Sequence, residues 1–513
     1  MPSRRYLYLT AFAGGLVSLA VEMAASHLLR PYFGSSNLVW APLIGLILLY
    51  LTAGYFIGGR WADRSPRPAT LYQIVAWAAF LVGLVPFAAR PVLTTVHLDA
   101  AGFDIAVLLG SFAAVLLLFS LPVTLLGCVS PFIIRLALAD VRSAGRVAGR
   151  VYAISTAGSF AGTFLPLLLL ALGCGTRDTF VLLALLLLLV ALGGLALSRP
   201  RLLLIYLWLP LLLLLLAFSR RGQPVRSPDG LIFETESPYN YIQVLADADG
   251  CRRLLLDDGA GVQSVYCPDP FRPLGVWDYF LVAPYFNPPP YPPERVAGVA
   301  IVGLAAGTVA RQYTAVYGPL PIDGAEIDPA IVRVGREYFA LDDLPNLRVF
   351  VADGRYFLSR SDRRYTVIVV DAYRATYIPS HLATVEFFRL AREHLTDDGV
   401  LAVNVAHARG DYRLVESLAG TLAQVFPAVH VVAVPESFNT VVVGTVRPTA
   451  PTDLAANLPL LDGRPLLAST ARQAAANLLP LSPGGLVFTD DHPLAELLTD
   501  AMVVDFALDS SRR

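Results

Sequence analysis

The sequence contains no lysine, so all 39 basic side chains are arginines. This excludes a lysine nucleophile, a Schiff-base lysine and the lysine of a Walker phosphate-binding loop. Charge of either sign is also scarce, because only 15% of the residues are charged, against about 25% in an average soluble protein. With a net charge of −1, the chain has no electrostatic basis for binding nucleic acid.

Cysteine is rare as well, and the four cysteines form no Cys-x-x-Cys pair. Zinc sites commonly take their ligands from such pairs, so we expect no metal. Cys128 and Cys174 fall in apolar segments, whereas Cys251 and Cys267 fall in the more polar part of the chain. A disulfide between the last two is possible, although the sequence does not favour it.

Apolar sequence is abundant, and it is concentrated in residues 1–218. A helix that spans a bilayer needs about 20 mostly apolar residues. Seven segments are candidates: Tyr6–Leu29, Leu38–Gly58, Leu71–Ala89, Phe103–Leu126, Val151–Leu172, Phe180–Leu197 and Leu202–Phe218. Pro122 and Pro131 make a break plausible within residues 103–139. We therefore predict a multi-pass α-helical membrane domain with the lipid bilayer as its partner.

Arginines are unevenly distributed between these segments. One set of alternate loops holds Arg4, Arg5, Arg60, Arg64, Arg67, Arg135, Arg142, Arg146, Arg150, Arg199 and Arg201, whereas the other short loops hold Arg30, Arg90 and Arg177 singly. The positive-inside rule places the arginine-rich loops in the cytoplasm. Glu22 and His27, in or at the end of the first segment, are candidates either for function or for a polar contact between helices.

The remaining residues divide by composition into four parts. Residues 219–230 are polar, with proline and glycine, and are typical of a linker. Residues 231–295 contain short apolar runs separated by glycine turns, which predict a small β subdomain. Residues 296–447 predict an α/β domain, and residues 448–513 form a C-terminal extension.

Within the α/β domain, short β-branched runs alternate with helical patterns, and each run ends in a glycine or an acid. Such runs predict parallel strands covered on both faces, in a doubly wound Rossmann-like sheet. Ligands bind at the carboxyl ends of the strands in these sheets. The residues there predict a nucleoside site, and they are Gly303, Ala305, Gly307, Glu326, Ile327, Asp353, Gly354 and Asp371.

The residue types at these strand ends suit an adenosyl group. The small residues from Gly303 to Gly307 would let backbone N–H groups and a helix N-terminus approach a ligand. Glu326, 19 residues after Gly307, could accept hydrogen bonds from both ribose hydroxyls. Asp353 could accept one from the adenine amine, although an Asp-Gly pair is also common in turns that bind nothing.

Several segments resemble those of spermidine synthases, the polyamine aminopropyltransferases, including members fused to membrane domains. The similar segments are ESPYNYIQV (with Asn240 in place of the family's Gln), LLLDDGAGVQS, EIDPAIVRVGREYF, DAYRATYIPSHLATVEFFRLAREHLTDDGVLAVNV and VFTDDHPLAELL. The resemblance implies a methyltransferase-type fold, S-adenosylmethionine or its decarboxylated form as co-substrate, and an amine acceptor. It adds Asn240 to the cofactor-binding residues, and a homodimer is possible.

The chain departs from the family pattern at three places. The first turn lacks the family's acid and has Leu304, Ala305 and Ala306 instead. Residues 277–279 read Trp-Asp-Tyr where the family has Tyr-His-Glu. Arg374 stands where the family's proton-accepting Asp is expected, and an arginine cannot serve as that base. Asp371 is retained and Tyr373 lies close in sequence, so we place catalysis around Asp371, Tyr373 and Arg374.

The resemblance predicts a membrane-bound transferase that moves an aminopropyl group to an amine. Two alternatives stay open: S-adenosylmethionine-dependent methyl transfer to another acceptor, and a non-catalytic nucleotide-binding transporter or sensor. Seven spans would put the soluble domain outside the cell, but an adenosyl co-substrate made in the cytosol argues against that. We therefore favour a cell-membrane protein with a cytoplasmic soluble domain.

Overall fold

The computed structural model describes residues 3–34, 37–96, 105–259, 261–373, 377–408, 410–480 and 485–510. The chain divides into two compact units. The helical unit contains Met1–Pro228 and Glu234–Tyr241, and the sheet unit contains Asp229–Phe233 and Ile242–Arg513.

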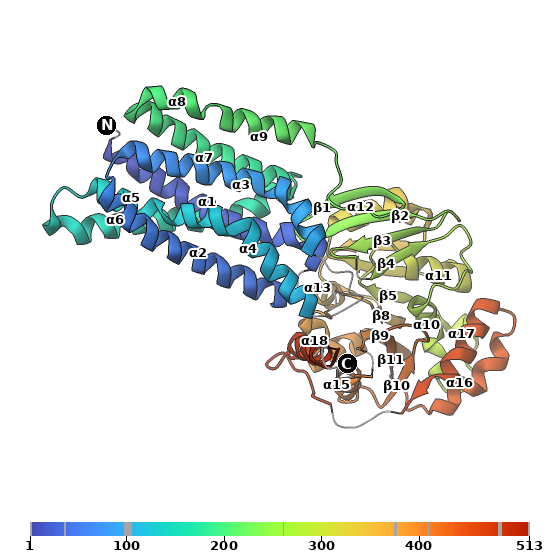
Figure 1. The fold of residues 1–513 in the computed structure, drawn as a ribbon. Coiled ribbons are helices and arrows are strands. Elements are labelled where there is room, and N and C mark those ends of the chain that lie inside the picture. Colours follow the sequence, from blue (N-terminus) through green and yellow to red (C-terminus); the bar gives the residue numbers. More distant parts are fainter. Residues whose placement is uncertain are drawn as a thin grey trace. The chain divides into compact units, whose positions relative to one another are not determined.

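Long apolar helices make up the helical unit (Figure 1). They are α1 (Arg4–Phe33), α2 (Asn37–Arg64), α3 (Pro68–Val96), α4 (Ile105–Gly127), α5 (Val129–Ala137), α6 (Ala144–Ala171), α7 (Thr176–Ser198), α8 (Pro200–Tyr206) and α9 (Trp208–Ser219). Among the described residues, seven stretches are long and apolar enough to cross a membrane, with α4–α5 and α8–α9 each counted as one. This confirms the predicted helical domain. The break falls at Cys128, between Pro122 and Pro131.

Small residues allow α1 and α6 to pack backbone against backbone. A Cβ atom added at Gly15 would lie 2.1 Å from the Ser155 carbonyl oxygen, and one added at Gly158 would lie 2.1 Å from that of Phe12. Neither position can therefore carry a side chain without separating the helices. Close approach of this kind is typical of helices that associate within membranes.

A four-stranded sheet precedes the α/β domain, with the order β1-β2-β3-β4. Its strands are β1 (Leu231–Glu236), β2 (Tyr241–Ala246), β3 (Arg252–Leu256) and β4 (Val262–Tyr266). β3 is antiparallel to both β2 and β4. This is the small β region expected between the linker and the nucleotide sheet.

The larger sheet has eight strands in the order β12-β10-β11-β9-β8-β5-β6-β7. They are β5 (Val299–Val302), β6 (Ile322–Glu326), β7 (Leu347–Val351), β8 (Tyr365–Val370), β9 (Leu395–Ala406), β10 (Ala428–Ala433), β11 (Asn439–Thr445) and β12 (Leu478–Leu479). β5 to β9 pair in parallel, and β11 and β10 continue the sheet antiparallel. This confirms the predicted Rossmann-like, methyltransferase-type fold.

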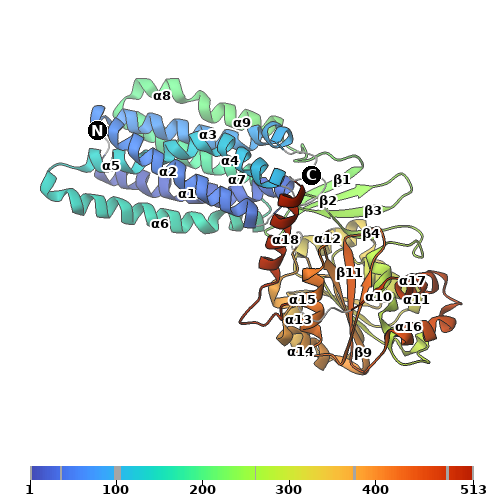
Figure 2. The ribbon, with the colours of Figure 1, turned by 60° about the horizontal axis from the view of Figure 1, so that its bottom comes forward.

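Helices cover both faces of this sheet (Figure 2). They are α10 (Val276–Val282), α11 (Thr308–Tyr317), α12 (Pro329–Tyr338), α13 (Gly354–Arg360), α14 (Val385–Glu393), α15 (Arg413–Leu422), α16 (Pro451–Asn457), α17 (Pro465–Ala476) and α18 (Ala495–Ser510). Val299 and Ile301 pack into the core on one face, whereas Ala300 and Val302 pack into the core on the other. Because side chains alternate along a strand, a strand buried on both faces is apolar throughout.

Short helical elements lie between the small sheet and the large one. α10 is followed by the 3-10 turn Ala283–Phe286, and Pro293–Arg295 form a 3-10 helix just before β5. The C-terminal extension also contributes β12 to the edge of the sheet, so it is part of the fold of this unit.

Candidate active site

The candidate site lies where the connections of the large sheet change direction. β5 is flanked by β6 and β8, and Val302 of β5 pairs with Ala325 and Val370 on those neighbours. The residues that directly follow this aligned row on the three neighbouring strands are Gly303, Glu326 and Asp371. The crevice at such a switch point is where ligands bind in doubly wound sheets.

Gly303 brings the first turn against the end of β8. It has a φ of +90°, and a Cβ atom there would lie 2.4 Å from the carbonyl oxygen of Asp371. Only glycine satisfies both the left-handed backbone and this close approach. Gly354 is constrained in a similar way, because its Cβ would lie 2.2 Å from Val302 Cγ1.

The backbone N–H groups of this turn are used within the protein, contrary to the expectation that they would face a ligand. Ala305 donates to Glu326 Oε2 (2.9 Å), and Ala306 donates to Ser264 Oγ (3.1 Å). Gly307 donates to the Leu304 carbonyl (3.0 Å). The small side chains of the turn leave room for a ligand close to the backbone. These three N–H groups, however, already donate to acceptors within the protein.

Glu326 ends β6 as an almost fully buried carboxylate. Its two oxygens accept hydrogen bonds from the N–H groups of Ala305 (2.9 Å) and Asp328 (3.0 Å). Burial raises the pKa of Glu326 to about 7, against the opposing effect of these bonds. Each carboxylate oxygen has two lone pairs, so Glu326 can still accept further hydrogen bonds. The neighbouring Ile327 side chain is 43% exposed and offers an apolar surface beside it.

Asp353 follows β7 and caps α13. Its Oδ1 accepts the N–H groups of Arg355 (2.9 Å) and Tyr356 (3.0 Å), and its Oδ2 lies 2.7 Å from His381 Nε2. The bond to His381 is the main cause that lowers the pKa of Asp353. Asp353 thus serves as the N-cap of α13, and a role toward adenine stays a prediction.

Asp371, directly after β8, is held by two side chains from other elements. Its Oδ2 accepts from the indole Nε1 of Trp277 on α10 (3.0 Å), and its Oδ1 accepts from Asn404 Nδ2 on β9 (2.9 Å). Burial raises the pKa of Asp371, although both bonds oppose the shift. A half-buried carboxylate whose pKa is raised and whose position is fixed is suited to accept a proton.

Tyr373 holds the backbone of β9, which carries Asn404. Its hydroxyl donates to the Asn404 carbonyl (3.0 Å) and accepts from the Ala406 N–H (2.8 Å). Burial raises the pKa of Tyr373 well above the ordinary value, so the hydroxyl stays protonated. Its observed bonds fix β9 beside Asp371. Arg374, the third predicted catalytic residue, lies outside the described residues.

Several residues at this site were missed as contributors by sequence reasoning. Trp277 was noted only as a departure from the family pattern, and Asn404 carried no signal because a polar residue inside a buried strand has many explanations. Ser264 and Thr308 join β4 to the glycine turn through a 2.9 Å hydroxyl–hydroxyl bond. An isolated serine and a helix-start threonine are too common for sequence to single them out.

Asn240, predicted to bind the cofactor, belongs to the helical unit, whereas the other described site residues belong to the sheet unit. It lies in the turn between β1 and β2, where Ser237 Oγ accepts its N–H (2.9 Å). Its cofactor role therefore stays a prediction. Among the described residues, no group of three or more His, Cys, Asp or Glu could hold a metal ion.

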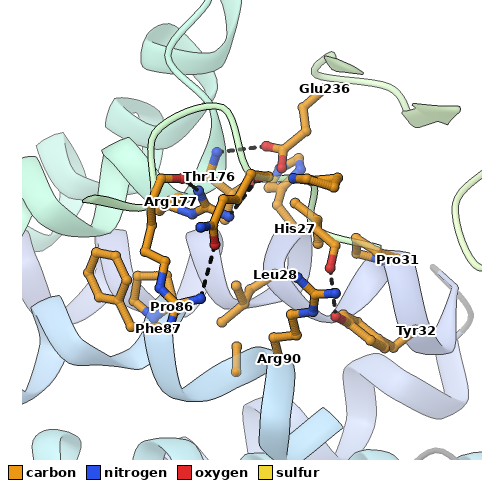
Figure 3. Close-up of a pocket in the computed structure, with 15 residues that line it drawn as sticks. His27, Leu28, Pro31, Tyr32, Pro86, Phe87, Arg90, Thr176, Arg177 and Glu236 are labelled. Carbon is orange, nitrogen blue, oxygen red and sulfur yellow. Dashed lines mark hydrogen bonds between the residues drawn. The ribbon is translucent and has the colours of Figure 1, made fainter. Parts of the chain in front are cut away.

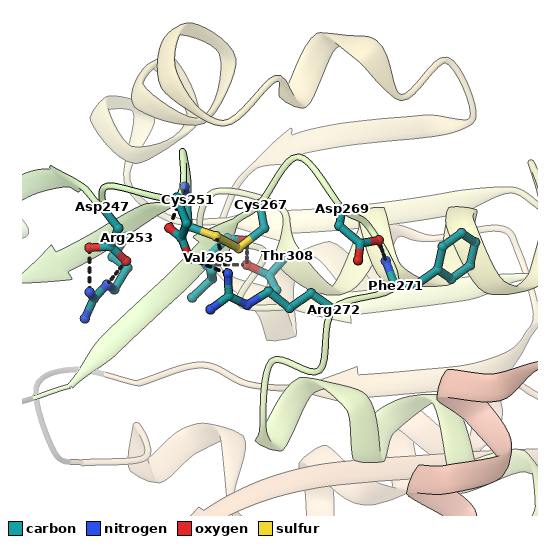
Figure 4. Close-up of a disulfide and its surroundings, with 10 residues drawn as sticks. Asp247, Cys251, Arg253, Val265, Cys267, Asp269, Phe271, Arg272 and Thr308 are labelled. Carbon is teal, nitrogen blue, oxygen red and sulfur yellow. Dashed lines mark hydrogen bonds and ion pairs between the residues drawn. A yellow bond between two sulfur atoms is a disulfide. The ribbon is translucent and has the colours of Figure 1, made fainter.

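One expectation about this region is corrected by the structure. Cys251 and Cys267 form a disulfide, which joins the residue before β3 to the residue after β4 (Figure 4). The sequence did not favour it because 16 residues separate the two cysteines and no motif marks the pair. The β3–β4 hairpin folds them together, with their Cα atoms 4.2 Å apart.

Comparison with known proteins places this geometry in a family. Residues 293–453 match the family model described as the spermine/spermidine synthase domain. A polyamine aminopropyltransferase of Vibrio vulnificus is 30% identical over 220 residues, which cover 41% of this chain and 71% of that protein. The chain belongs to the spermine/spermidine synthase family.

Two further similar proteins differ in how much of each chain the similarity covers. A probable polyamine aminopropyl transferase of Bifidobacterium longum is 37% identical over 199 residues, which are 38% of this chain and 42% of that relative. The match therefore spans less than half of that relative's length. A probable spermidine synthase of Corynebacterium glutamicum has a solved structure that is 20% identical with a TM-score of 0.39, covering 52% of this chain and 97% of that one.

Proposed function

We propose that the chain is a membrane-bound transferase of the spermidine synthase type, which moves an aminopropyl group from decarboxylated S-adenosylmethionine to an amine. The observation that carries the proposal is the Asp371 carboxylate at the switch point of the sheet, fixed by Trp277 and Asn404. Family membership supports the reaction class. A solved spermidine synthase in complex with the transition-state analogue AdoDATO supports the co-substrate class only by analogy.

The residues present fit an adenosyl group. Glu326 retains acceptor capacity for ribose hydroxyls, and the half-exposed Ile327 offers an apolar surface for a base. Gly303 adds no side chain at the end of β5. Asp353 fits less well than Glu326, because its Oδ1 already accepts two backbone N–H groups and its Oδ2 already pairs with His381.

Asp371 performs the proton chemistry in this proposal. When bound, the co-substrate supplies a carbon activated by its sulfonium, and that carbon's bond to sulfur breaks as the acceptor nitrogen bonds to it. The attacking amine must be neutral, and it loses a proton as it becomes substituted. Asp371 accepts that proton, and the bonds from Trp277 and Asn404 fix the orientation of its carboxylate.

Methyl transfer is the second candidate, and a specific observation favours it. The first turn has no acid, since its three central residues are Leu304, Ala305 and Ala306. The family resemblance assigns that acid to the amino-acid portion of the decarboxylated co-substrate. Without it, S-adenosylmethionine itself becomes an acceptable ligand, and methyl transfer to another acceptor follows. A cation at position 374 would in either case favour an acceptor that bears a carboxylate.

We also propose that the helical unit is embedded in the cell membrane. Its outer surface carries large apolar side chains, including Phe56 (67% exposed), Leu189 (74%) and Leu204 (73%). Soluble proteins rarely expose continuous apolar surface of this kind, whereas lipid tails cover it without cost.

Calorimetry on the full-length protein in detergent tests the proposal. S-adenosylmethionine, its decarboxylated form and methylthioadenosine are titrated separately, and product formation is then followed with putrescine and with carboxylate-bearing amines. We expect the decarboxylated form to bind and to yield a product. Asp371→Asn should lower the turnover number about a hundredfold or more while methylthioadenosine binding changes little. Absence of binding by all three ligands would refute the nucleoside site, and binding without product would favour the sensor.

A further inference from the structure

One end of the helical unit contains a cavity of about 60 Å³ that the transferase proposal does not use (Figure 3). The C-terminal turns of α1 and α3, the N-terminus of α7, the segment after α9 and Glu236 form its wall. All of these belong to the helical unit. A cavity of this size holds several waters or one small oxyanion, since one ordered water needs roughly 10–15 Å³.

Three arginines give the cavity its charge: Arg90, Arg177 and Arg220. In the part of the chain that the structure describes, none of them forms an ion pair with a carboxylate. Arg177 donates to the carbonyls of Arg220 (2.6 Å) and Gln223 (3.2 Å), and Arg90 reaches Ser227 Oγ at only 3.4 Å. Each guanidinium has five N–H donors, so donors remain to spare.

The acid in the wall does not neutralise these arginines. Glu236 accepts the N–H of Thr176 at 2.6 Å, at the first residue of α7, so its carboxylate already occupies that helix terminus. Burial raises the pKa of Glu236, which favours its uncharged form. The cavity therefore carries an excess of positive charge, beside apolar surface from Leu28 and Phe87.

We propose that this cavity, here called the arginine cavity, binds one oxyanion, either a phosphate or a carboxylate group. Guanidinium groups recognise such anions through paired, charge-assisted hydrogen bonds. The anion could belong to the headgroup of an anionic phospholipid or to a small soluble molecule. Because the apolar part of the wall adjoins helices that are apolar on their outer surface, a phospholipid phosphate is the source we expect.

Thermal unfolding of the full-length protein in nanodiscs tests this proposal. Phosphatidylcholine nanodiscs are compared with nanodiscs that also contain phosphatidylglycerol, and inorganic phosphate is titrated into the first kind. We expect phosphatidylglycerol to raise Tm, and Arg90→Gln to weaken the apparent affinity about tenfold or more. Arg64→Gln, an exposed arginine at the end of α2, is the matched control and should behave as wild type.

The outcomes separate the two sources of the anion. Stabilisation by inorganic phosphate in phosphatidylcholine alone would assign the cavity to a soluble anion, and stabilisation by phosphatidylglycerol alone would assign it to lipid. No stabilisation by either, or equal effects of Arg90→Gln and Arg64→Gln, would overturn the proposal. Arg220→Gln provides a second variant if Arg90→Gln does not fold.

The disulfide carries a second, independent inference about which side of the membrane the sheet unit occupies. Disulfides persist in oxidising compartments outside the cytosol. In the cytosol itself, cysteine thiols are kept reduced. Cys251 and Cys267 are both in the sheet unit, whereas Cys128 and Cys174, in the helical unit, are free.

The arginine distribution agrees with the disulfide. The arginine cavity brings together the ends of α1, α3 and α9 and the start of α7, so these termini lie at one end of the helical unit. The arginine-rich loops follow α2, α5 and α7 and therefore belong to the opposite end. The positive-inside rule makes that opposite end cytoplasmic. The chain leaves α9 at the other end and then enters the sheet unit.

We infer that the sheet unit lies outside the cytoplasm. This replaces the cytoplasmic location favoured from the sequence, which depended only on where an adenosyl co-substrate is made. Seven crossings, the arginine loops and the disulfide then agree without an extra or a missing span. One consequence is that an adenosyl substrate of this protein has to be supplied on the outer side.

Reporter fusions test the orientation in living cells. A reporter active only outside the cytoplasm, fused after Arg513, should be active, and the same reporter fused after Arg201 should be inactive. A reporter active only in the cytosol should give the reverse pair. In parallel, maleimide added to cells lysed under denaturing conditions should label Cys251 and Cys267 only after reduction. Cytosolic activity after Arg513, or two free thiols in the sheet unit, would overturn the inference.

Discussion

At the scale of single residues, two carboxylates with raised pKa values define the candidate site: Glu326 is buried and Asp371 is half-buried. Glu326 and Asp371 both end strands next to β5, and burial is the main cause of the shift in each. Their partners differ, because Glu326 is held by backbone N–H groups and Asp371 by two side chains. The position of the Glu326 side chain thus depends on the local turn, whereas that of Asp371 depends on the correct packing of α10 and β9.

The pKa of Glu326 predicts a pH dependence of ligand binding. The carboxyl is mostly protonated below its pKa of about 7, and a protonated carboxyl accepts fewer and weaker hydrogen bonds from the ribose hydroxyls than a carboxylate does. Methylthioadenosine should therefore bind more tightly as the pH rises through about 7, and level off above it. Glu326→Gln should bind about tenfold more weakly and without this pH dependence. Isothermal titration from acidic to mildly alkaline pH measures both. A Kd for wild type that is flat across the range would contradict the assignment.

At the scale of elements, the turn after β5 sets the geometry of the site. Gly303→Ala would place a methyl group against the Asp371 carbonyl and force a left-handed backbone on alanine. We expect a loss of about 2 kcal/mol or more of stability, together with weaker nucleoside binding. Gly420→Ala is the matched control, because its Cβ would meet no atom within 4 Å in helix α15. Thermal denaturation of both variants measures the difference in stability. Equal Tm values for the two variants would contradict the role of Gly303.

The hairpin of β3 and β4 supports the same turn from the other side. Ser264 of β4 accepts the Ala306 N–H, and the disulfide closes the hairpin beyond it. A loop of 16 residues closed by a disulfide is worth about 3 kcal/mol in the chain-entropy estimate. Replacing both Cys251 and Cys267 by serine should lower stability by about this amount and weaken nucleoside binding less than Gly303→Ala does. Chemical denaturation with and without reductant measures it, and no response of wild type to reductant would count against the disulfide.

At the scale of the whole molecule, apolar helices dominate the first part of the chain and predict how it fractionates. The protein should remain with the membrane after extraction at alkaline pH and enter solution only with detergent, because water cannot cover its exposed leucine and phenylalanine side chains. Immunoblotting of the fractions measures this. Recovery in the alkaline supernatant would contradict membrane insertion.

The helices and the strand ends could be predicted well from the sequence, since both follow from runs of apolar residues and from the glycines and acids that end these runs. Glu326, Asp353 and Asp371 stand at strand ends as expected. The partners of Asp371 could not be found in this way, because Trp277 and Asn404 are 94 and 33 residues away along the chain, and only the folded sheet brings them together. The disulfide was not favoured for the same reason, because only the folded β3–β4 hairpin brings Cys251 and Cys267 together. The bonds within the glycine turn also depend on distances that spacing does not encode.

The bond between Trp277 and Asp371 has a practical consequence for spectroscopy. Of the five tryptophans, Trp277 is the one that follows the helical region, since Trp40, Trp61, Trp77 and Trp208 all precede residue 219. Its indole N–H donates directly to the carboxylate that we assign as the proton acceptor. Replacing the four other tryptophans with phenylalanine would leave a single intrinsic fluorophore beside that carboxylate. Its emission would then follow protonation and ligand binding without any added label.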